Sequence, residues 1–174
     1  MLRKFGILAV LALTFHLPLL SAAEKTIAGM SFSTPENWKE TEPSSSMRKF
    51  QFEIPGKSKT AELAVFYFGE NQGGDVKSNI ERWKSQFTKL DKEETNEKAA
   101  GGMKVTQTTL EGSFQLTMGP MMAAHGKPAD NYSVLGAIVE APEGSVFFKM
   151  TGPKETLDGA KESFSSLINS VKKT

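Results

Sequence analysis

Two segments of the chain carry apolar side chains on both alternating faces, a pattern that predicts strands covered above and below. In 61–68, AELAVFYF, both alternating sets of side chains are largely apolar, so an extended conformation leaves no polar face. Segment 132–139 has the same character, and 146–150 carries two adjacent phenylalanines. Such strands need a packing element on each side of their sheet.

Shorter alternating segments predict further strands. Residues 50–54 alternate phenylalanine or isoleucine with polar side chains, which is the pattern of a half-buried strand, and 30–33 predicts a short first strand. The threonine-rich segments 105–110 and 113–117 predict two strands that meet at Gly112. Together with the two doubly apolar segments and the strand at 146–150, these patterns predict a sheet of six or seven strands, mostly joined by short turns.

A helix is predicted after the glycine-rich break that follows residue 68. Asp75 is well placed as its N-cap, since a side-chain oxygen there accepts a hydrogen bond from an otherwise unpaired backbone N–H. Apolar side chains then recur at helical spacing on one stripe: Val76, Ile80, Trp83, Phe87 and Leu90. The predicted helix therefore extends to Leu90, and 91–98 follows it as a solvated segment of mixed charge.

A second long helix is predicted near the end of the chain. Gly152 and Pro153 open it, with proline at the first helical position, where its missing N–H costs least. Its apolar stripe consists of Leu157, Ala160, Phe164, Leu167 and Val171. Lys172 and Lys173 are expected at the negative end of the helix dipole.

Residues 1–23 have the pattern of a secretory signal peptide. A basic start precedes an apolar run over 5–20, and small side chains precede the expected cleavage site after Ala23. This run is shorter than the roughly 20 residues that span a bilayer, so no stable membrane anchor is expected after cleavage. We therefore expect an exported protein, periplasmic or secreted, with a single domain over 24–174.

The composition of the mature chain argues against several functions. Removing residues 1–23 leaves 151 residues with a net charge of −1, which gives no electrostatic reason to expect nucleic acid as a partner. Without cysteine, disulfides and thiol chemistry are excluded. His125 is the only histidine after residue 23, and no serine lies in a glycine-flanked nucleophile elbow. We predict no enzymatic activity and no cofactor. An unrecognised hydrolase, for example one that uses paired carboxylates, ranks third among the hypotheses for the function.

The loop at 118–128, MGPMMAAHGKP, is the one candidate metal site. Thioether and imidazole groups suit copper(I), so four side chains could converge on one ion: Met118, Met121, Met122 and His125. Alternatively, the flexible methionines fold back to cover apolar core. The spacing matches no fixed metal motif, so a soft-metal site over 118–125 is the second hypothesis for the function.

These elements indicate an α+β domain with an antiparallel sheet and two long helices. Because the doubly apolar strands need cover on both sides, one helix on each face is expected, which gives a three-layer α/β/α sandwich.

The order of these elements resembles the PsbP-like fold family. The resemblance is carried by the short strand at 30–33, the turn at 35–38, the strand, glycine and helix at 66–83, and the ending at 147–171. That family includes the extrinsic photosystem II protein of the thylakoid lumen, a nuclear-import factor that binds the GTPase Ran, and exported bacterial proteins of uncharacterised function. The resemblance implies a non-catalytic binding or accessory role, with another exported protein as the partner, and it transfers no functional residue.

Overall fold

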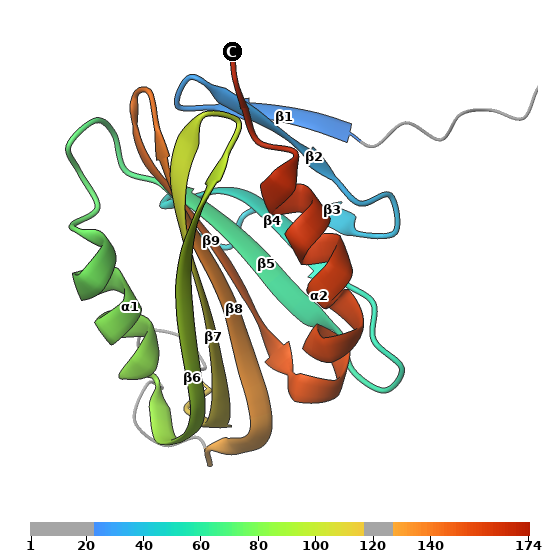
Figure 1. The fold of residues 1–174 in the computed structure, drawn as a ribbon. Helices are drawn as coiled ribbons and strands as arrows, with labels where there is room; N and C mark the ends of the chain where they lie inside the picture. Colours follow the sequence, from blue (N-terminus) through green and yellow to red (C-terminus); the bar gives the residue numbers. More distant parts are fainter. Residues whose placement is uncertain (1–22, 117–126) are drawn as a thin grey trace, which may run out of the picture.

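The computed structural model describes residues 23–116 and 127–174, which form two antiparallel sheets and two helices (Figure 1). The small sheet has the order β1-β2-β10 and consists of β1 (Ala23–Ile27), β2 (Met30–Thr34) and β10 (Lys172–Lys173). The large sheet contains β3 (Lys39–Thr41), β4 (Arg48–Ile54), β5 (Ala61–Tyr67), β6 (Phe87–Ala100), β7 (Met103–Phe114), β8 (Ala129–Ala141) and β9 (Gly144–Pro153). The helices are α1 (Val76–Lys84) and α2 (Lys154–Asn169).

The large sheet has the order β3-β4-β5-β9-β8-β7-β6, with every neighbouring pair antiparallel. The two strands predicted to be apolar on both faces, β5 and β8, lie in the middle of this sheet on either side of β9, the predicted strand with two adjacent phenylalanines. The predicted hairpin between the last two is also present, with Ala141 paired to Gly144. The prediction of a largely antiparallel α+β fold is therefore confirmed. Strands with two apolar faces lie in the middle of the sheet because they are stable only away from its edges.

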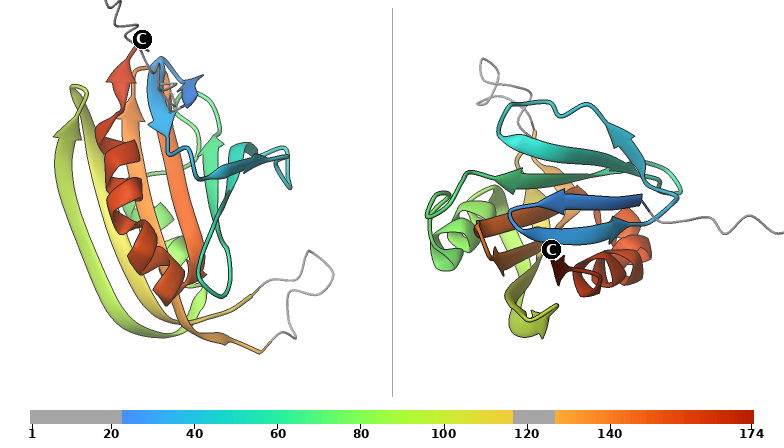
Figure 2. Two further views of the ribbon diagram at one scale, coloured as in Figure 1. Left: turned by 90° about the vertical axis from the view of Figure 1, so that its right-hand side faces the viewer. Right: turned by 90° about the horizontal axis from the view of Figure 1, so that it is seen from above.

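The two helices pack against opposite faces of the large sheet. On β8, Leu135 and Ala137 face the larger buried cluster, which includes α2, whereas Val134 and Ile138 face the smaller cluster, which includes α1. The small sheet shares the α2 face, where Phe32 of β2 lies in the larger cluster. Figures 1 and 2 show α1 and α2 on either side of the strands. Within the described residues, no helix is long and apolar enough to cross a membrane.

The prediction that the first helix extends to Leu90 is wrong, because α1 ends at Lys84 and Phe87 begins β6. The strand register is shifted between Phe87 and Lys89 and again between Leu90 and Lys92. These irregularities place Phe87 and Leu90, three residues apart, on the same side of β6 against the α1 cluster. The spacing of three between Phe87 and Leu90 fits a helical stripe, but in this protein it results from bulges in a β-strand.

The charged segment 91–98 is not an irregular loop but the outer strand β6, paired with β7 along its length. Its side chains are largely exposed, as expected, and charges along the edge discourage pairing with another chain. Likewise, β7 is one continuous strand rather than two that meet at Gly112. A Cβ on Gly112 would lie 2.1 Å from the carbonyl oxygen of Lys89, so the glycine lets the two backbones approach at the irregularity.

The predicted stripe of α2 is buried in the larger cluster, as expected. The helix ends at Asn169, however, and Lys172 and Lys173 do not serve as its final turn. They form β10 and pair with Ser31 and Met30 of β2. The chain end therefore completes the small sheet, a long-range pairing that no local pattern indicates.

Replacing Asp75 with alanine should lower the free energy of unfolding by about 1 kcal/mol. Asp75 is the N-cap of α1, as predicted: its Oδ1 accepts a hydrogen bond from the backbone N–H of Ser78 at 2.9 Å, and its Oδ2 accepts one from the Ser78 hydroxyl. Urea unfolding measures the change. Asp91→Ala, which removes only an exposed ion pair with Lys89, is the matched control and should cost less than about 0.5 kcal/mol. Equal effects of the two substitutions would contradict the cap assignment.

Candidate functional site

An open pocket lies beside α1, on the face of the large sheet opposite α2, and we call it the α1-side pocket. Its volume is about 300 Å³. Its apolar lining consists of Met47, Phe66, Phe68, Trp83 and Phe147. Its polar lining consists of Asn79, Arg82, Gln86 and Lys149. The pocket thus combines large apolar side chains with cations, which none of the predicted sites did.

The pocket exists because one face of β5 is only partly covered. The expectation that both faces of this strand are covered holds for Leu63 and Val65, which are fully buried. On the other face Phe66 is only half-buried. Next to it, Phe68 is 38% exposed and Met47 is 58% exposed. Large apolar side chains exposed together are typical of binding surfaces.

The aromatic wall of the pocket is held by ring contacts and by a glycine. The rings of Phe66 and Phe68 are stacked with centroids 6.2 Å apart, and Phe68 meets the edge of Phe147 at 5.8 Å. Gly73 has a φ of +90° and touches this wall, since a Cβ there would lie 2.8 Å from the Phe68 ring. The glycine break that was predicted before α1 therefore also shapes the pocket.

Lys149 rises from the middle of the sheet between two small residues. Ala64 of β5 and Gly136 of β8 are its partners in register, and the Trp83 ring lies directly over Gly136. The Lys149 ammonium donates a hydrogen bond to Oε1 of Gln86 at 2.5 Å. It also lies 5.5 Å from the centroid of the Phe114 ring, within cation–π range. A charged group is therefore held in a largely apolar setting.

Burial lowers the pKa of Lys149 from its ordinary value of 10.5 to about 8. The positive charge of Arg48 acts in the same direction, and the carboxylate of Glu62 opposes it. Those two groups pair with each other, with Nη1 of Arg48 2.6 Å from Oε1 of Glu62. Lys149 is therefore mostly charged at neutral pH, but it loses its proton more than two pH units earlier than an exposed lysine.

Arg82 supplies a second cation to the pocket. Its Nη1 donates a hydrogen bond to Oδ1 of Asn79 at 3.1 Å. The Asn79 amide is itself fixed, because its Nδ2 donates to the carbonyl oxygens of Gly73 and Asp75. None of the described residues that line the pocket is acidic. Within the described part of the chain, Arg82 and Lys149 each have a polar partner but no carboxylate partner. The site therefore carries two cations whose direct hydrogen-bond partners are neutral amides.

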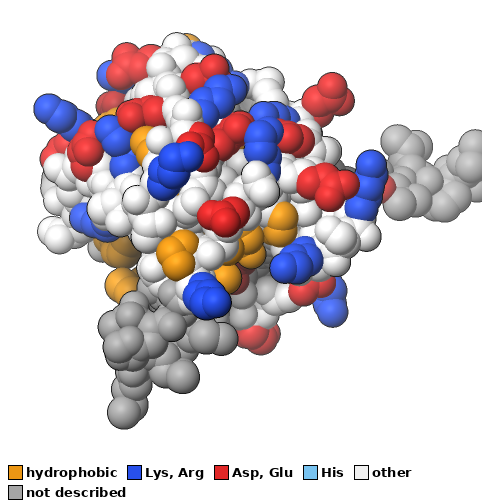
Figure 3. All heavy atoms as spheres, turned by 90° about the horizontal axis from the view of Figure 1, so that it is seen from below, with side chains coloured by type: hydrophobic (Ala, Val, Ile, Leu, Met, Phe, Trp, Pro, Cys, Tyr) orange, Lys and Arg blue, Asp and Glu red, His pale blue; other side chains and the backbone are white. Residues whose placement is uncertain are grey.

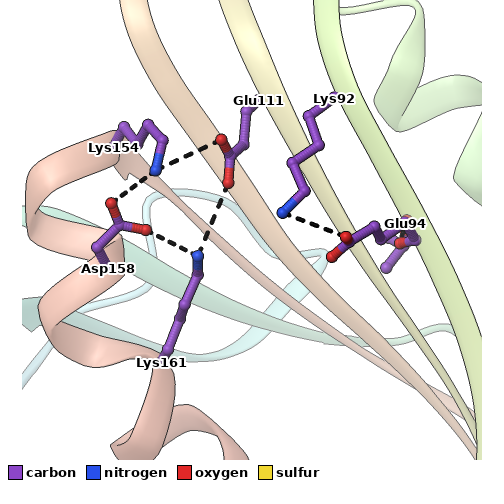
Figure 4. Close-up of polar contacts among 7 residues, drawn as sticks. Lys92, Glu94, Glu111, Lys154, Asp158 and Lys161 are labelled. Carbon is purple, nitrogen blue, oxygen red and sulfur yellow. Dashed lines mark hydrogen bonds and ion pairs between the residues drawn. The ribbon is translucent and has the colours of Figure 1, made fainter.

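A separate charged cluster on the α2 side is compensated. Glu111 of β7 is buried and lies 3.4 Å from the ammonium of Lys154 and 3.7 Å from that of Lys161. Asp158 contacts the same two lysines at 2.6 and 2.8 Å (Figure 4). These contacts hold the pKa of Asp158 below its usual range. Two carboxylates balance two ammonium groups, so this cluster attaches α2 to β7 and leaves no charge for a ligand.

The predicted metal ligands, Met118, Met121, Met122 and His125, lie outside the described residues, so copper binding by that loop stays a prediction. Among the residues that the structure does describe, no three His, Cys, Asp or Glu side chains are grouped to hold a metal ion. The hydroxyl of Ser133 is buried without a hydrogen-bond partner there, so no described base is positioned to activate it.

One feature of the sequence indicates the α1-side pocket: a lysine within an apolar strand. In β9 the run Val146 to Met150 is apolar apart from Lys149, and this strand lies between β5 and β8 in the middle of the sheet. A lysine in such a strand needs either a partner or access to solvent. The positions of Arg82 and Met47 beside it could not be inferred, because they depend on how α1 and β4 pack in three dimensions.

The surface at the lower end of the sheet carries charges of both signs. Seen from below, Lys and Arg side chains alternate with Asp and Glu side chains, and hydrophobic side chains are scattered between them (Figure 3). That face therefore offers no extended basic patch of the kind that nucleic acids require.

Comparison with known proteins supports the fold and no specific activity. Searches against family models and curated protein sequences found no match. Cyanobacterial PsbP (CyanoP) from Synechocystis is similar in structure, with a TM-score of 0.55 and 13% identity over 99% of both chains. A protein from Bacteroides thetaiotaomicron has a TM-score of 0.48 and 14% identity over 89% of this chain and 49% of its own.

PA94 from Pseudomonas aeruginosa, described as a protein of unknown function and putative regulator, has a TM-score of 0.48 and 12% identity over 86% of this chain and 94% of its own. The similarity to CyanoP confirms the PsbP-like fold that the order of elements predicted. At this level of identity it indicates the fold alone.

Proposed function

We propose that this protein is an exported, non-catalytic accessory domain that binds another exported protein through the α1-side pocket. The observation that carries the proposal is the pocket itself, in which exposed Met47 and Phe68 border two cations whose hydrogen-bond partners among the described residues are neutral amides. Exposed aromatic, methionine and arginine side chains are enriched where proteins bind one another. The proposal includes the three-layer α/β/α arrangement, with α1 and α2 as the outer layers.

The PsbP-like fold supports an accessory role by analogy, because the family resemblance carries no shared catalytic motif. Export rests on the signal-peptide pattern of 1–23, and Glu24 is then the mature N-terminus. The near-neutral mature chain and the mixed surface charge favour a protein partner over nucleic acid.

Affinity capture from the exported fraction of the source cells tests this function. The wild-type protein should retain a partner that the double variant Met47→Ser, Phe68→Ser loses, because truncation of exposed anchors removes most of the binding free energy. Leu116→Ser is the matched control: Leu116 is 38% exposed, like Phe68, but does not line the α1-side pocket. A partner retained equally by the double variant, or no partner at all, would contradict the proposal.

A further inference from the structure

The charge of the α1-side pocket restricts what can bind there. Arg82 and Lys149 line it, none of its described lining residues is acidic, and the two cations donate hydrogen bonds to the neutral amides of Asn79 and Gln86. An anionic group placed between them would form charge-assisted hydrogen bonds, and the planar guanidinium suits the two oxygens of a carboxylate. A neutral or cationic ligand would leave both cations uncompensated. The ligand is therefore expected to carry a negative charge.

The apolar wall restricts the ligand further. Phe66 and Phe68 present a stacked pair of rings, and Trp83 closes the side towards α1. An aromatic or branched aliphatic group fits against such a wall because ring faces and edges gain from close packing. The ligand therefore needs an apolar body attached close to its anionic group.

The size of the pocket determines how much of a ligand can enter. A volume of about 300 Å³ corresponds to roughly ten water molecules of the liquid. This volume holds one apolar side chain and one carboxylate, and because the pocket is open the chain that carries them can continue outside it. In a polypeptide, these two groups are joined at a single Cα only at the C-terminus. An internal Asp or Glu brings a carboxylate without the adjoining apolar body.

We propose that the α1-side pocket binds the C-terminal carboxylate of a partner polypeptide whose last residue is apolar. The carboxylate lies between Arg82 and Lys149, and the terminal side chain packs against Phe66, Phe68 and Trp83. This inference rests on the proposed function, because it names the part of the partner that enters the pocket.

Calorimetric titration with short peptides tests the inference. The probe is an acetylated tetrapeptide that ends in phenylalanine, and its C-terminal amide is the matched control without the negative charge. The acid should bind at least tenfold more tightly than the amide. Lys149→Met and Arg82→Met should each weaken binding of the acid at least tenfold. Lys77→Met, which removes a lysine of α1 outside the pocket, should leave it unchanged.

The pH dependence supplies a second readout. Because the ammonium form of Lys149 binds the carboxylate, affinity for the acid should fall at least tenfold from pH 7 to pH 9.5, above the lysine's pKa of about 8. The charged groups around Lys149 are Arg48 of β4, Glu62 of β5 and Arg82 of α1. In Lys149→Met the pH dependence should disappear.

Three outcomes would overturn the inference. Equal affinities for the acid and the amide, or no binding of either, would show that the pocket does not recognise a carboxylate. Equal affinities for 3-phenylpropionate and the peptide acid would assign the pocket to a small free acid instead of a chain end. Capture of a partner that depends on Met47 and Phe68 would still support the proposed function in each case, so the two failures are distinguishable.

Discussion

Replacing Trp83 with alanine should lower the free energy of unfolding by about 3 to 5 kcal/mol, which is the usual cost of removing a buried tryptophan. Trp83 is only 6% exposed and belongs to the cluster that attaches α1 to the sheet. Its ring lies over Gly136, where a Cβ would come within 2.3 Å of the ring carbon Cζ3. The missing side chain at Gly136 is therefore what allows the indole to pack directly on the sheet.

Denaturant unfolding of single and double variants measures this contact. Gly136→Ala alone should cost about 1 to 3 kcal/mol by overpacking against Trp83. In the Trp83→Ala background the same change should cost at least 0.5 kcal/mol less, roughly the smallest coupling that neighbouring residues show, because the ring is gone. Additive effects of the two substitutions would contradict the close packing, and a loss below about 0.5 kcal/mol for Trp83→Ala would place this side chain on the surface.

Replacing Lys149 with methionine should raise the free energy of unfolding at pH 7 by up to about 3 kcal/mol. In the unfolded chain the lysine has its ordinary pKa of 10.5, whereas burial lowers the pKa to about 8 in the folded protein. Each pH unit between these two values corresponds to about 1.4 kcal/mol. Methionine keeps the length and apolar character of the side chain and removes the charge that burial penalises.

The sign of the pH dependence follows from the same pKa values. Between pH 8 and pH 10.5 the unfolded chain binds more protons at Lys149 than the folded protein does, so this group makes stability rise with pH. Below pH 8 both states are protonated and the penalty is complete. The advantage of Lys149→Met over the wild-type protein should therefore be largest below pH 8 and shrink as the pH approaches 10.5.

Urea unfolding at pH 7, 8.5 and 10 compares the wild-type protein with Lys149→Met, so that contributions from other titrating groups cancel in the difference. Lys77→Met is the control for loss of one positive charge. Lys77 lies on the exposed side of α1, so its removal should change stability by less than about 0.5 kcal/mol at each pH. A Lys149→Met variant that is less stable than the wild type at pH 7, or a difference that does not change with pH, would contradict the buried-charge assignment.

Much of the fold follows from local pattern, because a strand or helix that buries one face must repeat its apolar side chains at the period of its backbone. The doubly apolar segments at 61–68 and 132–139, together with the segment at 146–150 that carries two adjacent phenylalanines, predicted the three central strands of the large sheet. The cap at Asp75 and the stripe of α2 were equally readable, since both depend on residues close together in the chain. The order of these elements was sufficient to predict a PsbP-like fold.

The parts of the fold that local pattern did not predict depend on pairing between segments that are distant in the chain. The bulges of β6 arise from its pairing with β7 and place Phe87 and Leu90 on one side of the strand. For this reason the prediction that the first helix extends to Leu90, which is reasonable from the local sequence, is wrong. The pairing of β10 with β2 likewise joins residues that are far apart in the chain.

The α1-side pocket depends on such contacts throughout. A lysine within an apolar strand was visible in the sequence, but its isolation from carboxylates follows from the packing of α1 over Gly136 and from the pairing of Arg48 with Glu62. Sequence pattern therefore determined which segments are buried. Only the tertiary structure decided which face of β5 stays open and which charges meet there, because both are set by distances between residues that are remote in the chain.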